Sequence, residues 1–560
     1  MGRADEPDSS PESDKRPPMA GDVAARRRDP VRSGPVRKAG VRPRQRQVTP
    51  RMADQTPATR HNILLLVTDQ QRVDTLGCYG NDVVDTPALD GLAAEGTRCE
   101  LAFTPTAVCT PARASLVTGV WPSRHKLLAN FERNVGYIEE LADTFPSFAF
   151  ALRDAGYRVG HVGKWHVGRE LGPEAFGFDG THFPGWSNPV RHPEYVAWLA
   201  AHGYPPYRLT DEVRGTFPNG QPGNLLAAIL EQPAEATFEA FLADRAIARL
   251  REYATGFHDR GEPFYLAVDW FGPHLPYCIP RAYFERYDPE SVRLPASIAE
   301  TFADKPRVQA QYSAHWAFDS LSLDTWRRLT AAYWGYATLI DEQVGRVLAA
   351  ARELGLWDST AVLFTADHGE FTGAHRLHDK GPAMYDDIYR IPLIARVPGS
   401  PTGRSEGRFA SFLDVTPTIL DLAGLPVPDS MDGRSLLPLV RGDEELPWRE
   451  EIFAEFHGHH FPYPQRMIRT DRYKLVINPA DINELYDLAA DPNELQNRYG
   501  HAELHGVRHE LMTRLYVEHG DSRRYRCNYP FEGRTTLNPN RLLRPRAPGR
   551  ASPAPTSSAP

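Results

Sequence analysis

Short apolar runs alternate with longer amphipathic stretches along most of this chain, and no other feature of the sequence restricts its fold so strongly. The apolar runs at residues 62–68, 264–269 and 361–365 have the length of buried strands. Residues 87–95 and 329–354 have helical spacing, and in the longer stretch the apolar positions recur every three or four residues: Tyr333, Tyr336, Ile340, Val344, Val347 and Ala351. Strands that alternate with helices predict an α/β fold, with a large, mostly parallel sheet covered by helices on both faces.

The pattern changes after about Gly442. Short, closely spaced strand-like segments follow at residues 452–456, 466–470, 473–477 and 484–486. Residues 502–518 then have the pattern of a helix. This spacing predicts a small antiparallel sheet with one helix beside it. We therefore expect a large α/β domain at residues 59–444 and a smaller α+β subdomain at residues 445–525.

Both ends of the chain differ in composition from the part between them. Residues 1–58 are rich in Arg, Pro, Asp and Ser and have no periodic pattern, and residues 526–560 are rich in Pro, Arg and Ser. Such segments cannot bury enough apolar surface to fold, so we expect both to be disordered tails. Met52 is an alternative start to Met1, in which case the N-terminal extension is not part of the protein.

The composition argues against several classes of protein. A net charge of -8 is not that of a dedicated nucleic-acid binder. No apolar stretch approaches the roughly 18 residues of a membrane span, so we expect no membrane partner. The five cysteines are too few, and odd in number, for a disulfide framework, and the start of the chain has no apolar signal segment. These features predict a cytoplasmic protein and leave its oligomeric state open.

The segment Cys109-Thr110-Pro111-Ala112-Arg113 has the features of a reactive helix start. Pro111 suits the first turn of a helix, which places Cys109 at the helix N-terminus. Backbone N–H groups and the helix dipole favour an anion at that position. Arg113 lies one turn later on the same face and can hold an oxygen of the nucleophile. The alternative is a buried structural cysteine beside an ordinary turn.

Two polar pairs follow two of the predicted strands. Asp69 and Gln70 end the strand at 62–68, and Asp367 and His368 end the strand at 361–365. Ligands of open α/β sheets bind outside the carboxyl ends of the strands. Together, these pairs could hold one hard cation between them. Either pair alone is equally compatible with a capping or structural role.

These segments together resemble the type I, formylglycine-dependent sulfatases of the alkaline phosphatase superfamily, whose signature is C-x-P-x-R. The resemblance implies that a formylglycine-generating enzyme oxidises Cys109 to formylglycine. The hydrated aldehyde would attack the sulfur of a small sulfated substrate, and collapse of the sulfated diol would release sulfate. The resemblance covers roughly residues 62–497.

The same resemblance implies that Asp69, Gln70, Asp367 and His368 bind one divalent metal ion together with residue 109. Gln70 stands where many sulfatases have a second aspartate, and His368 where many have asparagine. Calcium is the expected ion, but an imidazole ligand also suits manganese or zinc.

Four further residues match the family at separate places along the chain. Lys164 and His166 lie in a G-K-W-H-x-G segment, His274 lies in Gly-Pro-His-Leu-Pro, and Lys380 lies in His-Asp-Lys-Gly. In sulfatases, residues at the positions of Lys164 and Lys380 bind sulfate oxygens. The residue at His166 contacts the diol, and the one at His274 helps to protonate the leaving group.

Two other functions remain open at this point. Phosphonate monoester and phosphodiester hydrolases use the same nucleophile and often carry the Asp-Gln and Asp-His pairs, but they tend to lack Lys164 and His166. A non-catalytic binding protein would keep Cys109 unmodified. The sequence favours a hydrolase of aryl or carbohydrate sulfate monoesters. Residues 186–223 and 456–461 are candidate walls of its substrate pocket, although a packing role suits them equally.

Overall fold

The computed structural model describes residues 60–518, apart from residues 132, 133, 137, 143, 144, 146 and 480. Both predicted tails, at residues 1–58 and 526–560, and the alternative start at Met52 lie outside the described residues. Among the described residues, none of the helices has the length and apolar character needed to cross a membrane.

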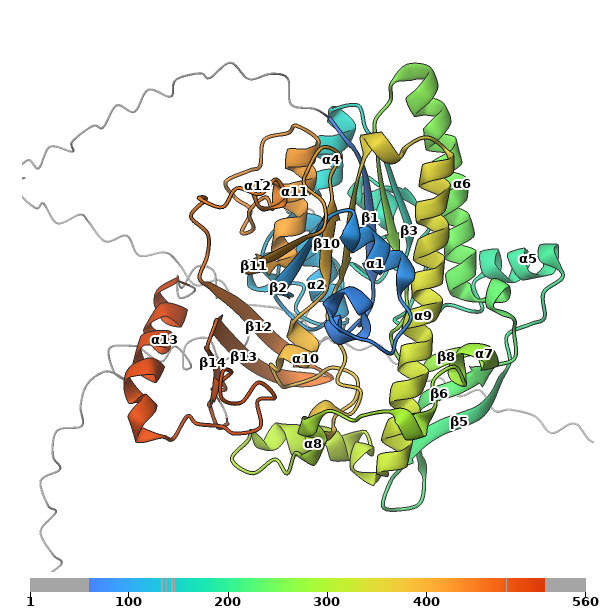
Figure 1. Ribbon diagram of the computed structural model, residues 1–560. Helices are drawn as coiled ribbons and strands as arrows, with labels where there is room; N and C mark the ends of the chain where they lie inside the picture. The colour runs from blue at the N-terminus through green and yellow to red at the C-terminus, as the bar shows by residue number, and fades with distance from the viewer. Residues whose placement is uncertain are drawn as a thin grey trace, which may run out of the picture. The chain divides into compact units, whose positions relative to one another are not determined.

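A sheet of eight strands forms the centre of the fold (Figure 1). Across the sheet, the strands are β11 (Arg404–Ser411), β2 (Thr97–Phe103), β10 (Leu393–Arg396), β9 (Thr360–Ala366), β1 (Asn62–Thr68), β7 (Phe264–Asp269), β3 (Arg158–Gly163) and β4 (Asp179–Gly180). Strand β10 runs antiparallel to β2 and β9, and the other pairs are parallel. The predicted mostly parallel sheet is therefore confirmed.

The apolar sequence of strand β1 suits its position in the centre of the sheet. All its residues, Asn-Ile-Leu-Leu-Leu-Val-Thr, are buried, because both faces of the sheet are covered. Leu64 and Leu66 belong to the hydrophobic core on one face, and Ile63 and Leu65 to the core on the other. A run without polar alternation is typical of a strand in this position.

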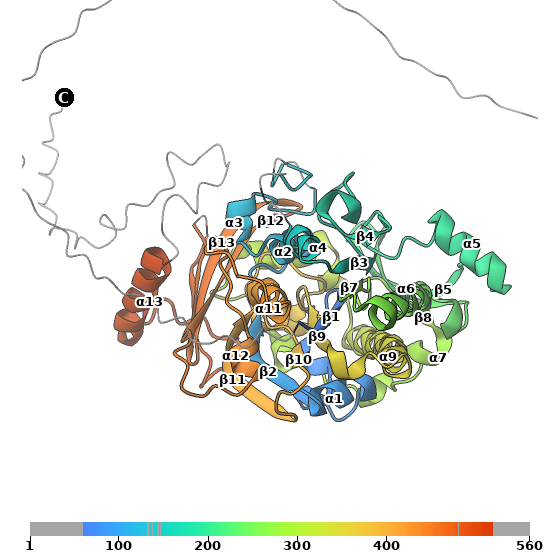
Figure 2. The same ribbon diagram turned by 90° about the horizontal axis from the view of Figure 1, so that it is seen from above.

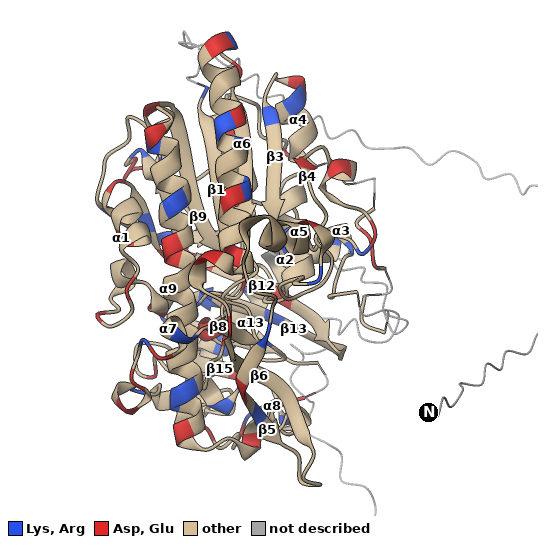
Figure 3. Cartoon of the chain, turned by 90° about the vertical axis from the view of Figure 1, so that its right-hand side faces the viewer, with Lys and Arg blue, Asp and Glu red and all other residues tan. Residues whose placement is uncertain are grey.

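Helices cover both faces of the large sheet (Figure 2). The helices α1 (Pro87–Ala94), α6 (Phe238–Arg260) and α9 (Leu323–Glu353) contribute to one core, and α2 (Cys109–Thr118), α4 (Phe148–Asp154) and α11 (Val415–Leu422) contribute to the other. Helix α9 confirms the helix predicted at 329–354, but it begins earlier, where the Ser322 hydroxyl accepts a bond from the Thr325 amide at 3.1 Å. Acidic and basic residues are interspersed along α6 and α9 (Figure 3).

The second predicted sheet is also present. It is antiparallel and contains β12 (Glu451–His459), β13 (Phe461–Thr470), β14 (Tyr473–Ile477) and β15 (Glu484–Asp487). Helix α13 (His505–Glu518) packs Leu511 and Leu515 against it, and a 3-10 turn, Ala502–Leu504, precedes the helix. The domain boundary at 444/445 stays a prediction.

A third sheet was not predicted from the sequence. It contains β5 (Leu209–Thr216), β6 (Pro222–Leu230) and β8 (Tyr277–Pro280). Most of β5 is polar and partly exposed, and its pairing with β6 shifts register at several points. This strand therefore lacks the apolar run or clean alternation that identifies strands from sequence.

Candidate active site

The two predicted polar pairs lie side by side beyond the large sheet. Strands β1 and β9 are parallel neighbours, and their last residues, Thr68 and Ala366, are paired. The residues that follow are therefore adjacent, and the amide N–H of Gln70 donates to Oδ1 of Asp367 at 3.1 Å. The two pairs are 297 residues apart in the sequence. They meet because β1 and β9 are neighbours in the sheet.

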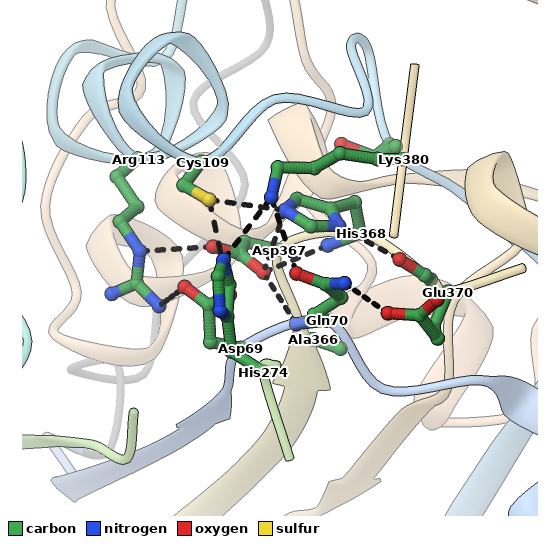
Figure 4. A network of polar contacts seen from close by, with 12 residues as sticks. Asp69, Gln70, Cys109, Arg113, His274, Ala366, Asp367, His368, Glu370 and Lys380 are labelled. Carbon is green, nitrogen blue, oxygen red and sulfur yellow. Dashed lines mark hydrogen bonds and ion pairs between the residues drawn. The ribbon is translucent and has the colours of Figure 1, made fainter. Parts of the chain in front are cut away.

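Cys109 is the first residue of α2, as the sequence predicted. Every residue of this helix is buried, and Cys109 is fully inaccessible. Its Sγ lies 3.2 Å from Nε2 of His368 and 3.8 Å from Oδ1 of Asp69 (Figure 4). The helix start therefore points its thiol at the ends of β1 and β9.

Arg113 links carboxylates from several strands. Its Nε donates to Oδ2 of Asp367 at 2.9 Å, and one terminal nitrogen donates to Oδ2 of Asp69 at 3.0 Å. The other terminal nitrogen donates to Oδ1 of Asp269 at 2.9 Å. Burial opposes the charge of Arg113, but these carboxylates raise its pKa. The sequence analysis missed Asp269, although it ends β7 as Asp69 ends β1, and that signal could have identified it.

Asp69, Cys109, Asp367 and His368 form a cluster that fits a metal ion. Their ligand atoms all lie within 4.8 Å of one another, and all the side chains are buried. Burial, together with the charge of Asp69, raises the pKa of Asp367. Burial lowers the pKa of His368, but Asp367 and Cys109 raise it to about 9. The buried carboxylates therefore stabilise positive charge at this position, and a cation-binding site requires such stabilisation.

Lys380 lies beside the predicted metal ligand Gln70. Its Nζ is 3.1 Å from Oε1 of Gln70, 3.1 Å from Nε2 of His274 and 2.9 Å from Oδ1 of Asp379. The Gln70 amide nitrogen donates to Asp379 at 3.0 Å and also to Glu370. Glu370 is fully buried and fixes this amide, a role that the sequence analysis did not identify.

Lys164 approaches the cluster through a different contact. Its Nζ lies 2.9 Å from Oδ2 of Asp69 and donates to the carbonyl of Trp186 at 2.5 Å. Burial raises the pKa of Asp69, but Lys164, His274 and Arg113 together hold it well below its usual range. Asp69 therefore stays ionised, in contact with cationic side chains.

The two predicted histidines occupy different positions. Nε2 of His274 lies 3.9 Å from Oδ1 of Asp69, and its Nδ1 lies 2.5 Å from the carbonyl of Leu275. The ring of His166 packs on that of Phe131 at 4.9 Å, and its buried Nδ1 has no hydrogen-bond partner among the described residues. Burial and the charge of a nearby lysine hold both histidine pKa values well below 6.5.

Asn130 also contacts the nucleophile position and was missed by the sequence analysis. Its Nδ2 lies 3.9 Å from Sγ of Cys109, and its Oδ1 accepts a bond from the Thr110 amide at 2.9 Å. No motif contains Asn130, so only the folded structure identifies it.

Comparison with known families decides the classification. The model of the Sulfatase family matches residues 61–425. The chain belongs to the sulfatase family. The model described as N-sulphoglucosamine sulphohydrolase, C-terminal, matches residues 373–520. The predicted family is confirmed, and the chain is a hydrolase of the sulfatase type.

Individual relatives extend over most of this sulfatase. An uncharacterized sulfatase of Escherichia coli (strain K12), YidJ, is 33% identical over 447 residues, which cover 78% of this chain and 83% of the relative. The multifunctional alkaline phosphatase superfamily protein PehA of Trinickia caryophylli is 29% identical over 493 residues, with 79% and 92% covered. The phosphonate monoester hydrolase of Agrobacterium radiobacter has a similar structure, with a TM-score of 0.68, 28% identity, and 82% and 96% coverage.

A cavity of about 590 Å³ opens beside the candidate active-site residues of this sulfatase, and Asn130, His166, His274 and Lys380 line it. Of the predicted wall at 456–461, His459 and His460 line the cavity. Of the predicted wall at 186–223, Trp186 alone does so among the described residues. The prediction is wrong for residues 187–223. This part of the chain leaves the cavity and forms α5 (Pro193–His202) and β5.

Proposed function

We propose that this sulfatase hydrolyses aryl or carbohydrate sulfate monoesters, with formylglycine formed from Cys109 as its nucleophile and one divalent metal ion as its cofactor. The observation that carries the proposal is the position of Cys109. It begins a buried helix and directs its thiol at His368 and Asp69. A nucleophile and a metal would meet there, among buried side chains.

Asp69, Gln70, Asp367 and His368 would hold the metal, together with the side chain of residue 109. The bound ion would supply positive charge that stabilises anionic oxygens and acidifies the attacking hydroxyl. Calcium is our first choice because most of the donors are oxygens, and the imidazole keeps manganese and zinc as alternatives. Arg113 would orient both aspartates through its bonds to them, and its positive charge favours the ionised form of each.

Formylglycine would supply a hydroxyl of its hydrated aldehyde, which a thiol cannot, after a formylglycine-generating enzyme has oxidised Cys109. Lys164 and Lys380 would bind the outer oxygens of the sulfate group. Both ammonium groups are buried, so the charge that they offer is weakly screened. Fixed cations of this kind stabilise the negative charge of a sulfuryl group during transfer.

His274 would deliver the proton that the leaving oxygen requires. Its Nδ1 contacts the Leu275 carbonyl, which leaves Nε2 to accept a hydrogen bond from Lys380 at 3.1 Å. Burial and the charges of Lys380 and Lys164 lower the pKa of His274, so the imidazole is neutral at pH 7. Nε2 would therefore have to take up a proton before His274 can pass it to the leaving oxygen, and the negative charge of a bound sulfate group would favour this uptake.

Hydrolysis of phosphonate monoesters and phosphodiesters is the second candidate. The Asp-Gln and Asp-His pairs favour it, and so does the structural similarity to the phosphonate monoester hydrolase of Agrobacterium radiobacter. A diester carries a second ester arm, which must fit where Lys164 lies. Lys164 is fully buried and held by Asp69 and by the carbonyl of Trp186. These contacts favour a compact sulfate monoester.

The test uses matched nitrophenyl esters. Protein co-expressed with a formylglycine-generating enzyme should show a higher kcat/KM for the sulfate monoester than for the phosphonate monoester or the phosphodiester. A preference for the diester would replace this proposal with the second candidate. Mass spectrometry of the tryptic peptide that contains residue 109 should show a mass lower than that of the cysteine form by nearly one water. A wholly unmodified, inactive protein would instead indicate a binding function.

A further inference from the structure

The cavity beside the active site is larger than a sulfate group requires. Its volume of about 590 Å³ lies in the range of pockets that enclose whole small molecules. Lys380, His274 and His166 account for the end where sulfate would bind. The remaining walls have no role in the chemistry described above, so they are available to the part of the substrate that leaves.

The charged side chains of these walls occur in opposite pairs. Lys380 lies 2.9 Å from Asp379, and Arg169 lies 2.7 Å from Glu139 and 3.8 Å from Glu170. Among the described residues that line the cavity, each lysine or arginine therefore has a carboxylate partner. A polyanionic chain would need unpaired cations there, and these walls do not offer them.

Two histidines of the cavity add polar groups without charge. His459 and His460 follow each other at the end of β12, and their rings lie 3.8 Å apart. Burial is the main reason that the pKa of each lies below 6.5, and their proximity to other histidines and to Lys380 contributes. Near pH 7 these imidazoles are neutral and can exchange hydrogen bonds with hydroxyl groups.

Aromatic rings supply the apolar part of the walls. Trp186 packs beside His274 with 5.5 Å between ring centres, and Trp316 packs on His460 with 5.0 Å between ring centres. Both tryptophans line the cavity, and Asn224 lies on the same walls. The cavity thus combines flat apolar faces with neutral hydrogen-bonding groups.

Hydrogen bonds to buried side chains fix the wall that contains Trp186. The Trp186 carbonyl accepts the bond from Lys164, and Nδ2 of Asn188, two residues later, donates to Glu239 at 2.9 Å and to Tyr336 at 3.2 Å. Glu239 and Tyr336 are themselves joined by a 2.6 Å hydrogen bond. These contacts to α6 and α9 hold the segment in place in advance of substrate binding, which reduces the entropic cost of binding.

We infer that the cavity binds the leaving group of the sulfate ester as an uncharged sugar ring, which packs against Trp186 and Trp316. This inference rests on the proposed function. A pyranose has an apolar face of C–H groups and a rim of hydroxyls, which match the indole rings and the imidazole and amide groups. A small quaternary ammonium group makes no hydrogen bonds and would leave most of the volume unused, although aromatic rings alone can attract it.

The first experiment compares sulfate esters that share the reacting group. The modified, metal-loaded enzyme is assayed with a methyl pyranoside monosulfate, phenyl sulfate, choline sulfate and a uronate-containing disaccharide with several sulfates. The highest kcat/KM is expected for the methyl pyranoside monosulfate. Trp316→Ala should lower this value by at least about fivefold, because one aromatic contact is lost. Phe150→Ala is the matched control, since this aromatic residue is 43% exposed and does not line the cavity.

A second experiment does not depend on turnover. Intrinsic tryptophan fluorescence is titrated with the unsulfated methyl pyranoside, phenol or choline chloride. The pyranoside should change the emission of the wild type, and Trp316→Phe should lose much of that change. If the enzyme hydrolyses none of the sulfate esters, the proposed function fails while this titration still tests the cavity.

In the turnover assay, any of four results would overturn the inference. These are a preference for choline sulfate, for phenyl sulfate or for the polyanionic disaccharide, or equal kcat/KM values in the wild type and Trp316→Ala. A fluorescence response to choline or phenol but not to the pyranoside leads to the same conclusion.

Discussion

Sγ of Cys109 lies 3.2 Å from Nε2 of His368, although 259 residues separate the two positions. The other ring nitrogen of His368 lies 2.8 Å from the carbonyl of Gly369, which turns Nε2 toward the thiol. One residue begins a helix and the other follows a strand, so the sheet and its covering helix together create this contact.

Cys109→Ala should abolish turnover and leave the fold intact. Only the nucleophile is lost, and alanine fits a helical position that is already fully buried. We expect kcat to fall by at least about 10³-fold, as in other enzymes that lose their nucleophile. The measurement is nitrophenyl sulfate hydrolysis together with a thermal melt. Cys99→Ala, at a buried cysteine of β2, is the control and should remain active. Residual activity of a few percent in Cys109→Ala would rule out the formylglycine mechanism.

Asp367→Asn should lose bound metal, whereas Asp269→Asn should keep it. Both aspartates accept a 2.9 Å bond from Arg113, but Asp367 alone of the two belongs to the cluster with Asp69, Cys109 and His368. Comparison of the two variants therefore separates the loss of a metal ligand from the loss of a hydrogen bond to Arg113. Elemental analysis of the purified variants gives the answer, and full metal content in Asp367→Asn contradicts the site.

Chelation should remove activity and lower the melting temperature, because an ion that binds only the folded protein stabilises it. At about one hundred times its dissociation constant, the ion should contribute about 2.7 kcal/mol. Re-addition of calcium, manganese or zinc in parallel identifies the ion. If chelated protein keeps full activity and shows no bound metal, the metal proposal is wrong.

Lys164→Ala should reduce sulfatase activity more than any diesterase activity. The ammonium group would contact the charge that changes in the transition state, and loss of such a contact typically costs about 10²-fold. The assay uses the same matched nitrophenyl esters on both proteins. Arg169→Ala is the control, because it removes a cation that lines the cavity and is paired with Glu139, and it should change both activities little. Equal losses of the two activities in Lys164→Ala would favour the phosphonate hydrolase alternative.

The free energy of unfolding should fall in mild acid because of the buried His125. It is fully buried, with Nδ1 accepting a bond from the Leu127 amide at 3.1 Å and Nε2 lying 3.1 Å from the Ser115 hydroxyl. Burial lowers its pKa to about 3. Below pH 6.5 the unfolded chain gains a proton that the folded protein does not, so stability falls as pH falls from about 6.5 toward 3. Between pH 7.5 and pH 5, this residue should account for a loss of about 2 kcal/mol.

The measurement for His125 is the free energy of unfolding at both pH values in the wild type and His125→Gln. The variant should show a smaller loss than the wild type, whatever its absolute stability. His202→Gln, at an exposed histidine of α5, controls for the change of residue type. Parallel curves for the wild type and His125→Gln would show that the proton at His125 does not matter.

The sequence could predict the features that depend on near neighbours in the chain. Strand β1 follows from an unbroken apolar run, and most of α9 follows from apolar positions repeated at helical spacing. The start of α2 at Cys109 follows from Pro111 in its first turn. These signals are local because hydrogen bonding within a helix and burial of a single strand each act over a few residues. The family signature is local too, since its cysteine, proline and arginine lie within five consecutive residues, 109–113.

The tertiary structure alone decided which distant side chains meet. The convergence of Asp69, Asp269 and Asp367 on Arg113 depends on the order of β7, β1 and β9 in the sheet, and no local pattern encodes that order. The same is true of the cavity, whose walls come from segments far apart in the sequence, Trp186 and His460 among them. Buried charged groups shift one another's pKa values strongly only when they are in contact. The pKa shifts of the site therefore arise only when the sheet forms and brings these groups together.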